Sequence, residues 1–185
     1  SLRQAIAEAL AGDIITFNIP GGGPHTITLN SELLIDKNLT INAGNAALLT
    51  INGNGTSRVF KVDAGVTATL KNMTITGGSS PDDGGGIKNA GTLTLSNCVI
   101  TGNAAKLNAP CCNDIGRGGG IYNAPNATLT VDGCTITNNT GIGGGGIYND
   151  GGASGDYASV MVKNSAISGN SAGTNPNRGS GSGGG

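Results

Sequence analysis

Short stretches of alternating apolar and polar residues recur along most of the chain. In one of them, Leu93, Leu95, Cys98 and Ile100 would point to one side of the strands, and the residues around them, mostly Thr, to the other. Alternation with a period of two is typical of half-buried β-strands. Asn and Gly tolerate the positive φ of a sharp bend, so corners are expected where they interrupt the alternation. The pattern predicts coils of three short strands and three corners.

Five copies of one strand-forming segment align along the chain, each starting with Asn or Gly and reaching a second Gly or Asn six residues later. The asparagines that open four of these copies are predicted corners: Asn38, Asn72, Asn97 and Asn164. The same alignment predicts one interior column of isoleucines: Ile41, Ile75, Ile100, Ile136 and Ile167. A second interior column is expected from residues of the preceding strands: Ala68, Leu93, Leu129 and Val160.

A glycine triplet followed by Ile, Lys or Tyr, and Asn occurs three times, starting at Gly84, Gly118 and Gly144. The segments between the second corner and the triplet vary in length and are rich in Pro, Gly, Asn, Asp and Ser, which is typical of solvated loops. These inserts are residues 79–83, 104–117, 140–143 and 171–182. Because the strands keep their length while the inserts do not, we expect variable recognition along this one edge.

Strands this short need partners, and equivalent strands of successive coils would pair in parallel with like side chains stacked. The sequence therefore predicts an all-β fold, a single-stranded parallel β-helix, with coils over residues 14–170. The general chirality of parallel crossovers favours a right-handed winding.

The two ends of the chain differ from the coils. Residues 1–13 place Leu2, Ile6 and Leu10 on one helical face with Gly12 as a stop, which predicts a short helix that caps the coil stack. Residues 171–185 are a Gly/Ser-rich insert leading to a truncated or continuing coil, with a flexible linker as the alternative. An uncapped stack presents unpaired strand edges, so we expect self-association or continuation into a larger parent chain at the open end.

Composition excludes two classes of partner. The 185 residues include 35 Gly and no Trp, 11% are charged, and the formal net charge is -1. Ten Lys and Arg against eleven Asp and Glu do not supply the basic surface that neutralises nucleic-acid phosphates. The apolar runs are far shorter than the roughly 18 residues of a membrane-spanning helix. We therefore expect neither a nucleic-acid partner nor a membrane span in this chain.

The acidic residues are scattered, and the nearest approach to a cluster is Asp82, Asp83 and Asp114, in neighbouring inserts with Lys88 and Arg117 close in sequence. These three carboxylates are weak candidates for a Ca²⁺ or acidic-sugar site, and solvated loop charges are the alternative. The sequence otherwise predicts no catalytic residues and no cofactor, because the paired carboxylates of a glycoside hydrolase are not evident.

The opening Ser1-Leu2-Arg3-Gln4-Ala5-Ile6 resembles the Cys-Ser-Leu-Arg-Glu-Ala (CSLREA) motif of bacterial surface and secreted β-helix proteins, without the leading Cys and with Gln4 in place of Glu. The Gly-Gly-Gly-Ile-Tyr-Asn units are similar to those of the same group and to the repeats of chlamydial polymorphic outer-membrane proteins, whose repeat Phe is missing here. The resemblance implies a right-handed β-helix exported to the cell surface or medium, often within a much larger chain, and it brings no catalytic residues.

The four cysteines fall into two pairs. Cys98 and Cys134 occupy inward positions of neighbouring coils and are expected to be small core residues, with a disulfide between them as the alternative. Cys111 and Cys112 are adjacent in the longest insert. In the secreted protein that the resemblance implies, they would form a vicinal disulfide or a bond to another chain.

The predicted function is a non-enzymatic extracellular or cell-surface structural module, an adhesin stalk or a filament subunit that assembles through its coil ends. A surface glycan or a ligand on a host cell would be its other partner. The alternative is a carbohydrate-binding or polysaccharide-lyase-like β-helix, and cation-dependent adhesion through the Asp-bearing inserts is a third possibility.

Overall fold

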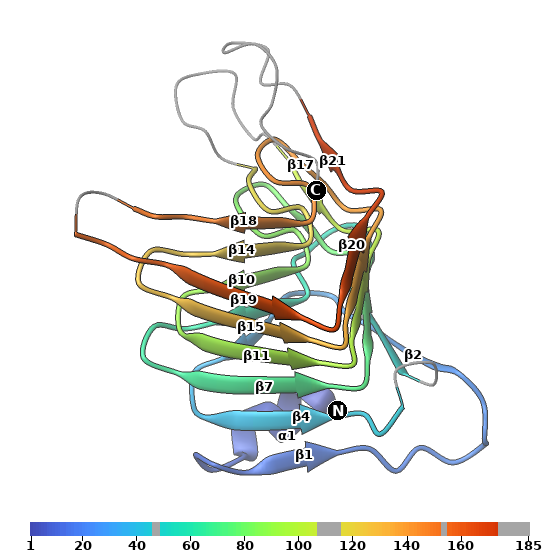
Figure 1. Cartoon of the computed structure of the whole chain (residues 1–185). Helices are drawn as coiled ribbons and strands as arrows, with labels where there is room; N and C mark the ends of the chain where they lie inside the picture. Colours follow the sequence, from blue (N-terminus) through green and yellow to red (C-terminus); the bar gives the residue numbers. More distant parts are fainter. Residues whose placement is uncertain (46–48, 107–115, 153–154, 174–185) are drawn as a thin grey trace.

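The computed structural model describes residues 1–45, 49–106, 116–152 and 155–173. They form a parallel β-solenoid of about five turns with one short helix, α1 (Leu2–Glu8) (Figure 1). The predicted all-β parallel β-helix is confirmed, and its right-handed winding stays a prediction. Within these residues, no helix is long and apolar enough to cross a membrane.

The strands of the described residues form four parallel sheets, which we call A to D. Sheet A contains β1 (Ile14–Thr16), β4 (Leu39–Asn42), β7 (Thr67–Lys71), β11 (Thr92–Ser96), β15 (Thr128–Asp132) and β19 (Ser159–Lys163). Sheet B contains β2 (His25–Thr28), β5 (Leu49–Asn52), β8 (Thr74–Thr76), β12 (Val99–Thr101), β16 (Thr135–Thr137) and β20 (Ala166–Ser168). Sheet C contains β3 (Leu33–Ile35), β6 (Phe60–Val62), β10 (Ile87–Asn89), β14 (Ile121–Asn123) and β18 (Ile147–Asn149). Sheet D contains β9 (Ser79–Ser80), β13 (Ala104–Ala105), β17 (Thr140–Gly141) and β21 (Ser171–Ala172).

A full coil has four strands, in the order C, A, B and D, and the prediction of three strands is wrong. Sheet D was missed because its strands are two residues long, too short to show any alternation. They occupy the starts of segments expected to be solvated loops. The glycine triplets then pass so close to sheet D and to one another that a Cβ on Gly85 would lie 2.5 Å from the carbonyl oxygen of Gly119.

The predicted isoleucine column is confirmed in four of its five members. Ile75, Ile100, Ile136 and Ile167 pair in register through sheet B. The member before Ile75 is Ile51, while Ile41 lies in sheet A opposite Leu70. The reason is that the sequence Leu-Thr-Ile-Asn occurs twice, in β4 of sheet A and in β5 of sheet B. The prediction used the copy in β4, although the copy in β5 belongs to the isoleucine column.

The second predicted column is confirmed, and Leu39 extends it by one turn. Its members pair in register through sheet A: Leu39, Ala68, Leu93, Leu129 and Val160. Cys98 and Cys134 are buried and free, with the Cys98 amide 3.3 Å from the Cys134 sulfur, so the expectation of two stacked core residues is confirmed. The hydrogen bond with Cys134, together with burial, raises the pKa of the Cys98 thiol well above its usual range.

Three of the four predicted corner asparagines connect sheet A to sheet B with left-handed backbone. Asn72, Asn97 and Asn164 have φ values of 59°, 52° and 50°, and Gly133 has 64° at the same place in its coil. Asn38 also lies at a corner, but at a different one: it stands between β3 and β4, where the chain passes from sheet C to sheet A, and its φ is not positive. Its side-chain oxygen accepts a hydrogen bond from the Thr67 amide.

Stacked asparagines tie the turns together at the corner between sheets B and D. The side-chain amide of Asn139 donates to the carbonyls of Ile100 and Thr137 and to the side chain of Asn170. Its side-chain oxygen accepts from the backbone and side-chain amides of Asn103. Asn103 and Asn139 are buried, so these bonds satisfy polar groups that water does not reach.

A second ladder of asparagines closes the corner between sheets C and A. Asn89 donates to the side chain of Asn123 at 2.7 Å, and Asn123 donates to that of Asn149 at 2.8 Å. The same side-chain amides also donate to backbone carbonyls, such as that of Thr128 for Asn89. Each asparagine therefore joins its own turn to the next.

Helix α1 packs against the first turn of the solenoid. Its N-cap is Ser1, and Leu2 and Ile6 are buried in the core cluster. The helix ends at Glu8 rather than at Gly12, because the Asp13 carboxylate accepts from the Leu10 amide and the chain leaves helical geometry at Ala9. Leu10 is therefore 74% exposed, and its predicted place on the buried face is wrong.

We predict that Asn139→Ala lowers the free energy of unfolding by about 3 kcal/mol, because it leaves buried partners on two neighbouring turns without hydrogen bonds. Urea unfolding measures the change. Asn18→Ala, at an exposed position between strands, is the matched control and should change stability by less than about 0.5 kcal/mol. Equal effects of the two variants would contradict a stabilising role of the ladder.

We also predict that Gly119→Ala destabilises the protein by about 3 kcal/mol or more, because the new Cβ overpacks a site lined by backbone. It would lie 2.6 Å from the carbonyl oxygen of Gly145 and closer still to that of Thr140. In Gly151→Ala the added Cβ meets nothing within 4 Å, so its melting temperature should match that of the wild type. A tolerated Gly119→Ala would show that the triplets do not need to pack this closely.

Candidate functional site

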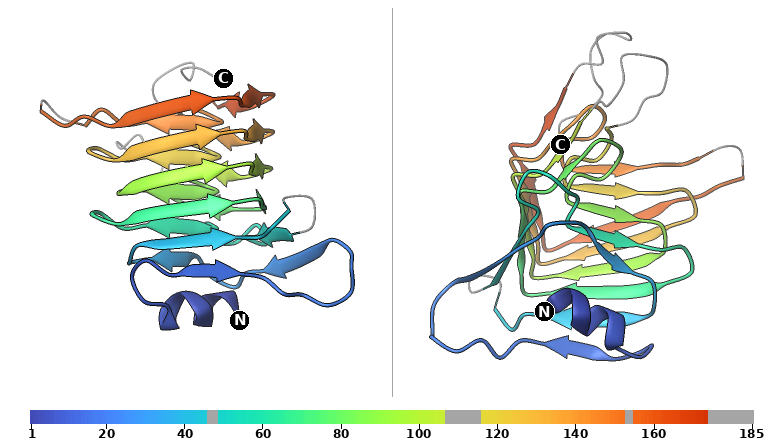
Figure 2. Two further views of the ribbon diagram at one scale, coloured as in Figure 1. Left: turned by 60° about the horizontal axis from the view of Figure 1, so that its bottom comes forward. Right: turned by 180° about the vertical axis from the view of Figure 1, so that it is seen from behind.

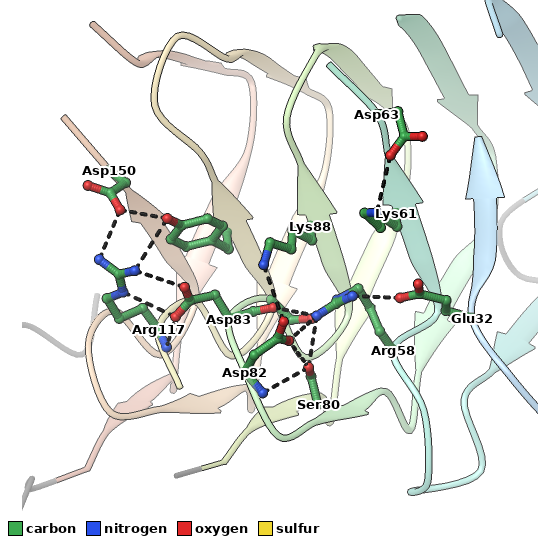
Figure 3. A network of polar contacts seen from close by, with 12 residues as sticks. Glu32, Arg58, Lys61, Asp63, Ser80, Asp82, Asp83, Lys88, Arg117 and Asp150 are labelled. Atoms are coloured by element: carbon green, nitrogen blue, oxygen red, sulfur yellow. Dashed lines mark hydrogen bonds and ion pairs between the residues drawn. The ribbon is translucent and has the colours of Figure 1, made fainter. Parts of the chain in front are cut away.

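A connected network of polar contacts lies along the outer side of sheet C (Figure 3). Successive strands of this sheet place Leu34, Lys61, Lys88, Tyr122 and Tyr148 opposite one another in one column. The segments flanking these strands add acidic and basic side chains. We call the connected group the charged edge, and its members are Glu32, Arg58, Ser80, Asp82, Asp83, Lys88, Arg117, Tyr122 and Asp150.

Arg58 is the first centre of the charged edge, and it is only 8% exposed. Its Nη1 donates to Glu32 at 2.5 Å, and its Nη2 donates to the Asp82 carboxylate and to the Ser80 hydroxyl. Its Nε and Nη2 also donate to the carbonyls of Gly84 and Asp83. A buried guanidinium is tolerated because its donors have acceptors and its charge faces two carboxylates.

Arg117 is the second centre. It donates to both carboxylate oxygens of Asp83, at 3.1 and 2.8 Å, and to Asp150 at 2.9 Å. Its guanidinium carbon lies 5.1 Å from the ring centre of Tyr122 and 5.0 Å from that of Tyr148, within cation–π range. The two rings are stacked 6.0 Å apart, and the Tyr122 hydroxyl donates to Asp150 at 2.5 Å.

Among the residues that precede the strands of sheet C, the sign of the charge alternates over four turns, whereas within the strands Lys61 and Lys88 are like charges opposite each other. Glu32 precedes β3, Arg58 precedes β6, Asp82 and Asp83 precede β10, and Arg117 precedes β14, and Asp150 follows β18. Adjacent turns of a parallel sheet lie about 4.8 Å apart. At this spacing, like charges on adjacent turns repel and opposite charges attract. The two arginines each pair with carboxylates on both sides of their own turn: Arg58 with Glu32 and Asp82, and Arg117 with Asp83 and Asp150.

Two carboxyl pKa values record this pairing. Burial alone would raise the pKa of Asp150, but the hydrogen bond from Tyr122 and the charge of Arg117 lower it below its ordinary value of 3.8. Burial also opposes ionisation of Asp82, and Ser80, Arg58 and Lys88 together lower its pKa below the same value. Burial and the bond to Asp150 raise the pKa of the Tyr122 hydroxyl. The Asp82 and Asp150 carboxylates are thus held ionised and the Tyr122 phenol neutral.

The structure brings together two of the three carboxylates that were candidates for a cation site. Asp82 faces Arg58 and Lys88, and Asp83 faces Arg117, so guanidinium and ammonium groups already occupy the carboxylate oxygens that a metal ion would need. Across the described part of the chain, no group of three or more His, Cys, Asp or Glu is arranged to hold a metal. Asp114, Cys111 and Cys112 lie outside the described residues.

Glu32, Arg58, Asp150 and the pair Tyr122 and Tyr148 were not predicted from the sequence. One signal for part of the cluster was present, because Asp83 and Arg117 each stand directly before a glycine triplet and so occupy equivalent positions on neighbouring turns. Arg58 precedes a strand without such a triplet, so the repeat alignment could not place it.

Beside the charged edge is a shallow depression of about 280 Å³. Glu32, Thr56, Ser57, Ser80 and Asp82 are among the residues that line it, with Arg58 at its base. The Ser57 hydroxyl is the one buried side-chain polar atom of the described residues without a hydrogen-bond partner. The depression thus combines carboxylates and hydroxyls around a fixed positive charge.

No protein-family model, curated protein or solved structure matches the chain. The likeness to CSLREA and polymorphic outer-membrane proteins therefore rests on the motif residues themselves.

We predict that stability falls as the pH drops below 3.8, because lowered carboxyl pKa values stabilise the native state above the ordinary pKa and lose that effect as the native groups protonate. Asp150→Asn should therefore be less stable than the wild type at about pH 6 and approach it at about pH 2. Urea midpoints across this range test the effect, with Glu8→Gln on the exposed side of α1 as the control. A constant difference between Asp150→Asn and the wild type would refute the ionic role.

Proposed function

We propose that this chain is a non-enzymatic structural module of the cell surface or extracellular medium, in which a stiff stack of coils acts as a spacer. The observation that carries the proposal is the continuity of the ladders from turn to turn. The isoleucine ladder of sheet B, the apolar ladders of sheet A and the two asparagine ladders each run through consecutive coils. A stack in which every turn is fixed to the next resists bending.

The charged edge supports a structural role for the same reason. Its arginines and carboxylates are committed to one another, and both the buried Arg58 and the half-buried Arg117 bridge carboxylates of two different turns. Groups held in this way are suited to fixing the spacing of turns. They are poorly suited to proton transfer, which needs a group that changes its protonation near neutral pH.

The location outside the cell is supported by the opening motif and the Gly-Gly-Gly-Ile-Tyr-Asn units, which resemble those of exported bacterial β-helix proteins. Membership of that group is part of the proposal. Within it, the β-helix would hold an adhesive or anchoring segment at a distance from the cell.

A second candidate function is glycan binding at the depression beside Arg58. Its carboxylates and hydroxyls are the groups that hydrogen-bond to sugar hydroxyls. In this role the stack would still be a spacer, with the charged edge as its recognition surface.

We expect antibodies against this chain to label intact cells of its source, and added protease to remove the label without cell lysis. Permeabilised cells provide the control for total antigen. Label that appears only after permeabilisation would overturn the surface location. Retention on a polysaccharide column that is lost in Asp82→Asn would favour glycan binding, whereas no retention would leave the spacer role alone.

A further inference from the structure

One outward-facing position of sheet A is polar in the inner strands and apolar in the two end strands. In the four inner strands this position is always Thr, half-buried on the outer face: Thr40, Thr69, Thr94 and Thr130. At the same register position, β1 has Ile14 and β19 has Met161. These side chains are 65% and 61% exposed. In this column of sheet A, apolar residues therefore replace Thr in the two end strands and in no other described strand of the sheet.

The next residue along each strand of sheet A points inward and is apolar in all six strands, and it is more exposed in the two end strands than in the inner ones. In the inner strands it is held by fully buried side chains: Ile41, Leu70, Leu95 and Val131. At the ends it is held by Ile15, which is half-buried, and by Val162, which is 42% exposed. Within the described residues, neither end strand has a second neighbour in the sheet that would complete burial of its apolar side chain.

Sheet B ends in the same way. Ile27 in β2 and Ile167 in β20 occupy the two ends of the isoleucine ladder, and both are half-buried while the Ile51 between them is fully buried. The residues beside them are small and polar or Ala at both ends: Thr26, Thr28, Ala166 and Ser168. The two ends of sheet B would therefore match in register if they were brought together.

Strand β1 keeps one edge without a described partner, because β4 is its one neighbour in the sheet. The left-hand view of Figure 2 draws α1 at this end of the stack, and its apolar side chains Leu2 and Ile6 belong to the buried core. Among the described strands, β1 and β19 form the two edges of sheet A, and β2 and β20 form those of sheet B. The backbone groups on these outer edges are available to a further strand.

We propose that two copies of the chain join head to tail, with β19 of one copy pairing in parallel with β1 of the next and β20 pairing with β2. This places Met161 beside Ile14, Val162 beside Ile15 and Ile167 beside Ile27, so that both ladders continue across the junction in their established register. The contact joins two different surfaces, so repeated addition gives a filament rather than a closed dimer. This pairing rests on the proposed structural function and specifies how the modules are connected.

The alternative geometry, two β19 ends meeting back to back, fits the same observations less well. A two-fold axis between the copies makes their strands antiparallel, which breaks the parallel register that every described sheet follows. It also leaves Ile14 exposed, so the apolar residue at the β1 end would have no counterpart.

Cysteine cross-linking tests the pairing in the whole chain, with Cys111 and Cys112 replaced by Ser to remove background. Ile14→Cys and Met161→Cys are made separately and mixed under mild oxidation by glutathione disulfide. We expect a covalent dimer in the mixture and none from either variant alone, because each junction then contains one cysteine only. The double variant Ile14→Cys with Met161→Cys should give a ladder of multimers. Thr16→Cys mixed with Met161→Cys, two residues out of register on the same outward face, is the control.

Three results would overturn the pairing. A covalent dimer from Met161→Cys alone would show that open ends meet back to back. Equal cross-linking of the Thr16→Cys mixture would show contact without register. Absence of any cross-link, with a single monomeric species in sedimentation at every concentration, would show that the β19 edge does not bind a second copy. Surface labelling of cells is independent of these results, so the location and the pairing can fail separately.

Discussion

An asparagine side chain carries a donor and an acceptor on one short stem, and the arrangement of the turns depends on this property. In the corner ladders each side-chain amide donates to backbone carbonyls and to the asparagine of the following turn, while its oxygen accepts from the preceding one. A buried corner cannot use water, so its polar groups need partners from the chain itself. Repetition of the same residue at the same place supplies those partners over three consecutive turns at each of the two corners.

The same geometry explains why the glycines are so numerous where sheet D meets the triplets. The asparagine corners fix the spacing of the turns, and sheet D then brings backbone against backbone with no room for side chains. Close approach of this kind is available to Gly and is costly for any residue with a Cβ. The abundance of glycine, which in another chain would indicate disorder, here accompanies tight packing.

The sequence predicted sheets A and B well because their strands are long enough for period-two alternation. It could not predict sheet D, since two residues such as Ser79 and Ser80 have no period. It misplaced Ile41 because identical strands, β4 and β5, belong to different sheets, and only pairing with the next turn distinguishes them.

For the charged edge, the ion pair of Asp83 with Arg117 was accessible from the triplet spacing. The contacts of Arg58 with Glu32 and Asp82 depend on the fold of three separate segments, which no local pattern records.

The ion pairs of Arg58 and Arg117 restrict how the number of coils can change without bringing like charges together. Removing the one turn that carries Asp82 and Asp83 would bring Arg58 against Arg117, and two buried or half-buried guanidinium groups would then face each other. Removing or duplicating turns in pairs preserves the order of signs. Loss or gain of a single inner coil would therefore bring like charges together beside sheet C, whereas a change by two coils would keep the order of the Arg58 and Arg117 ion pairs.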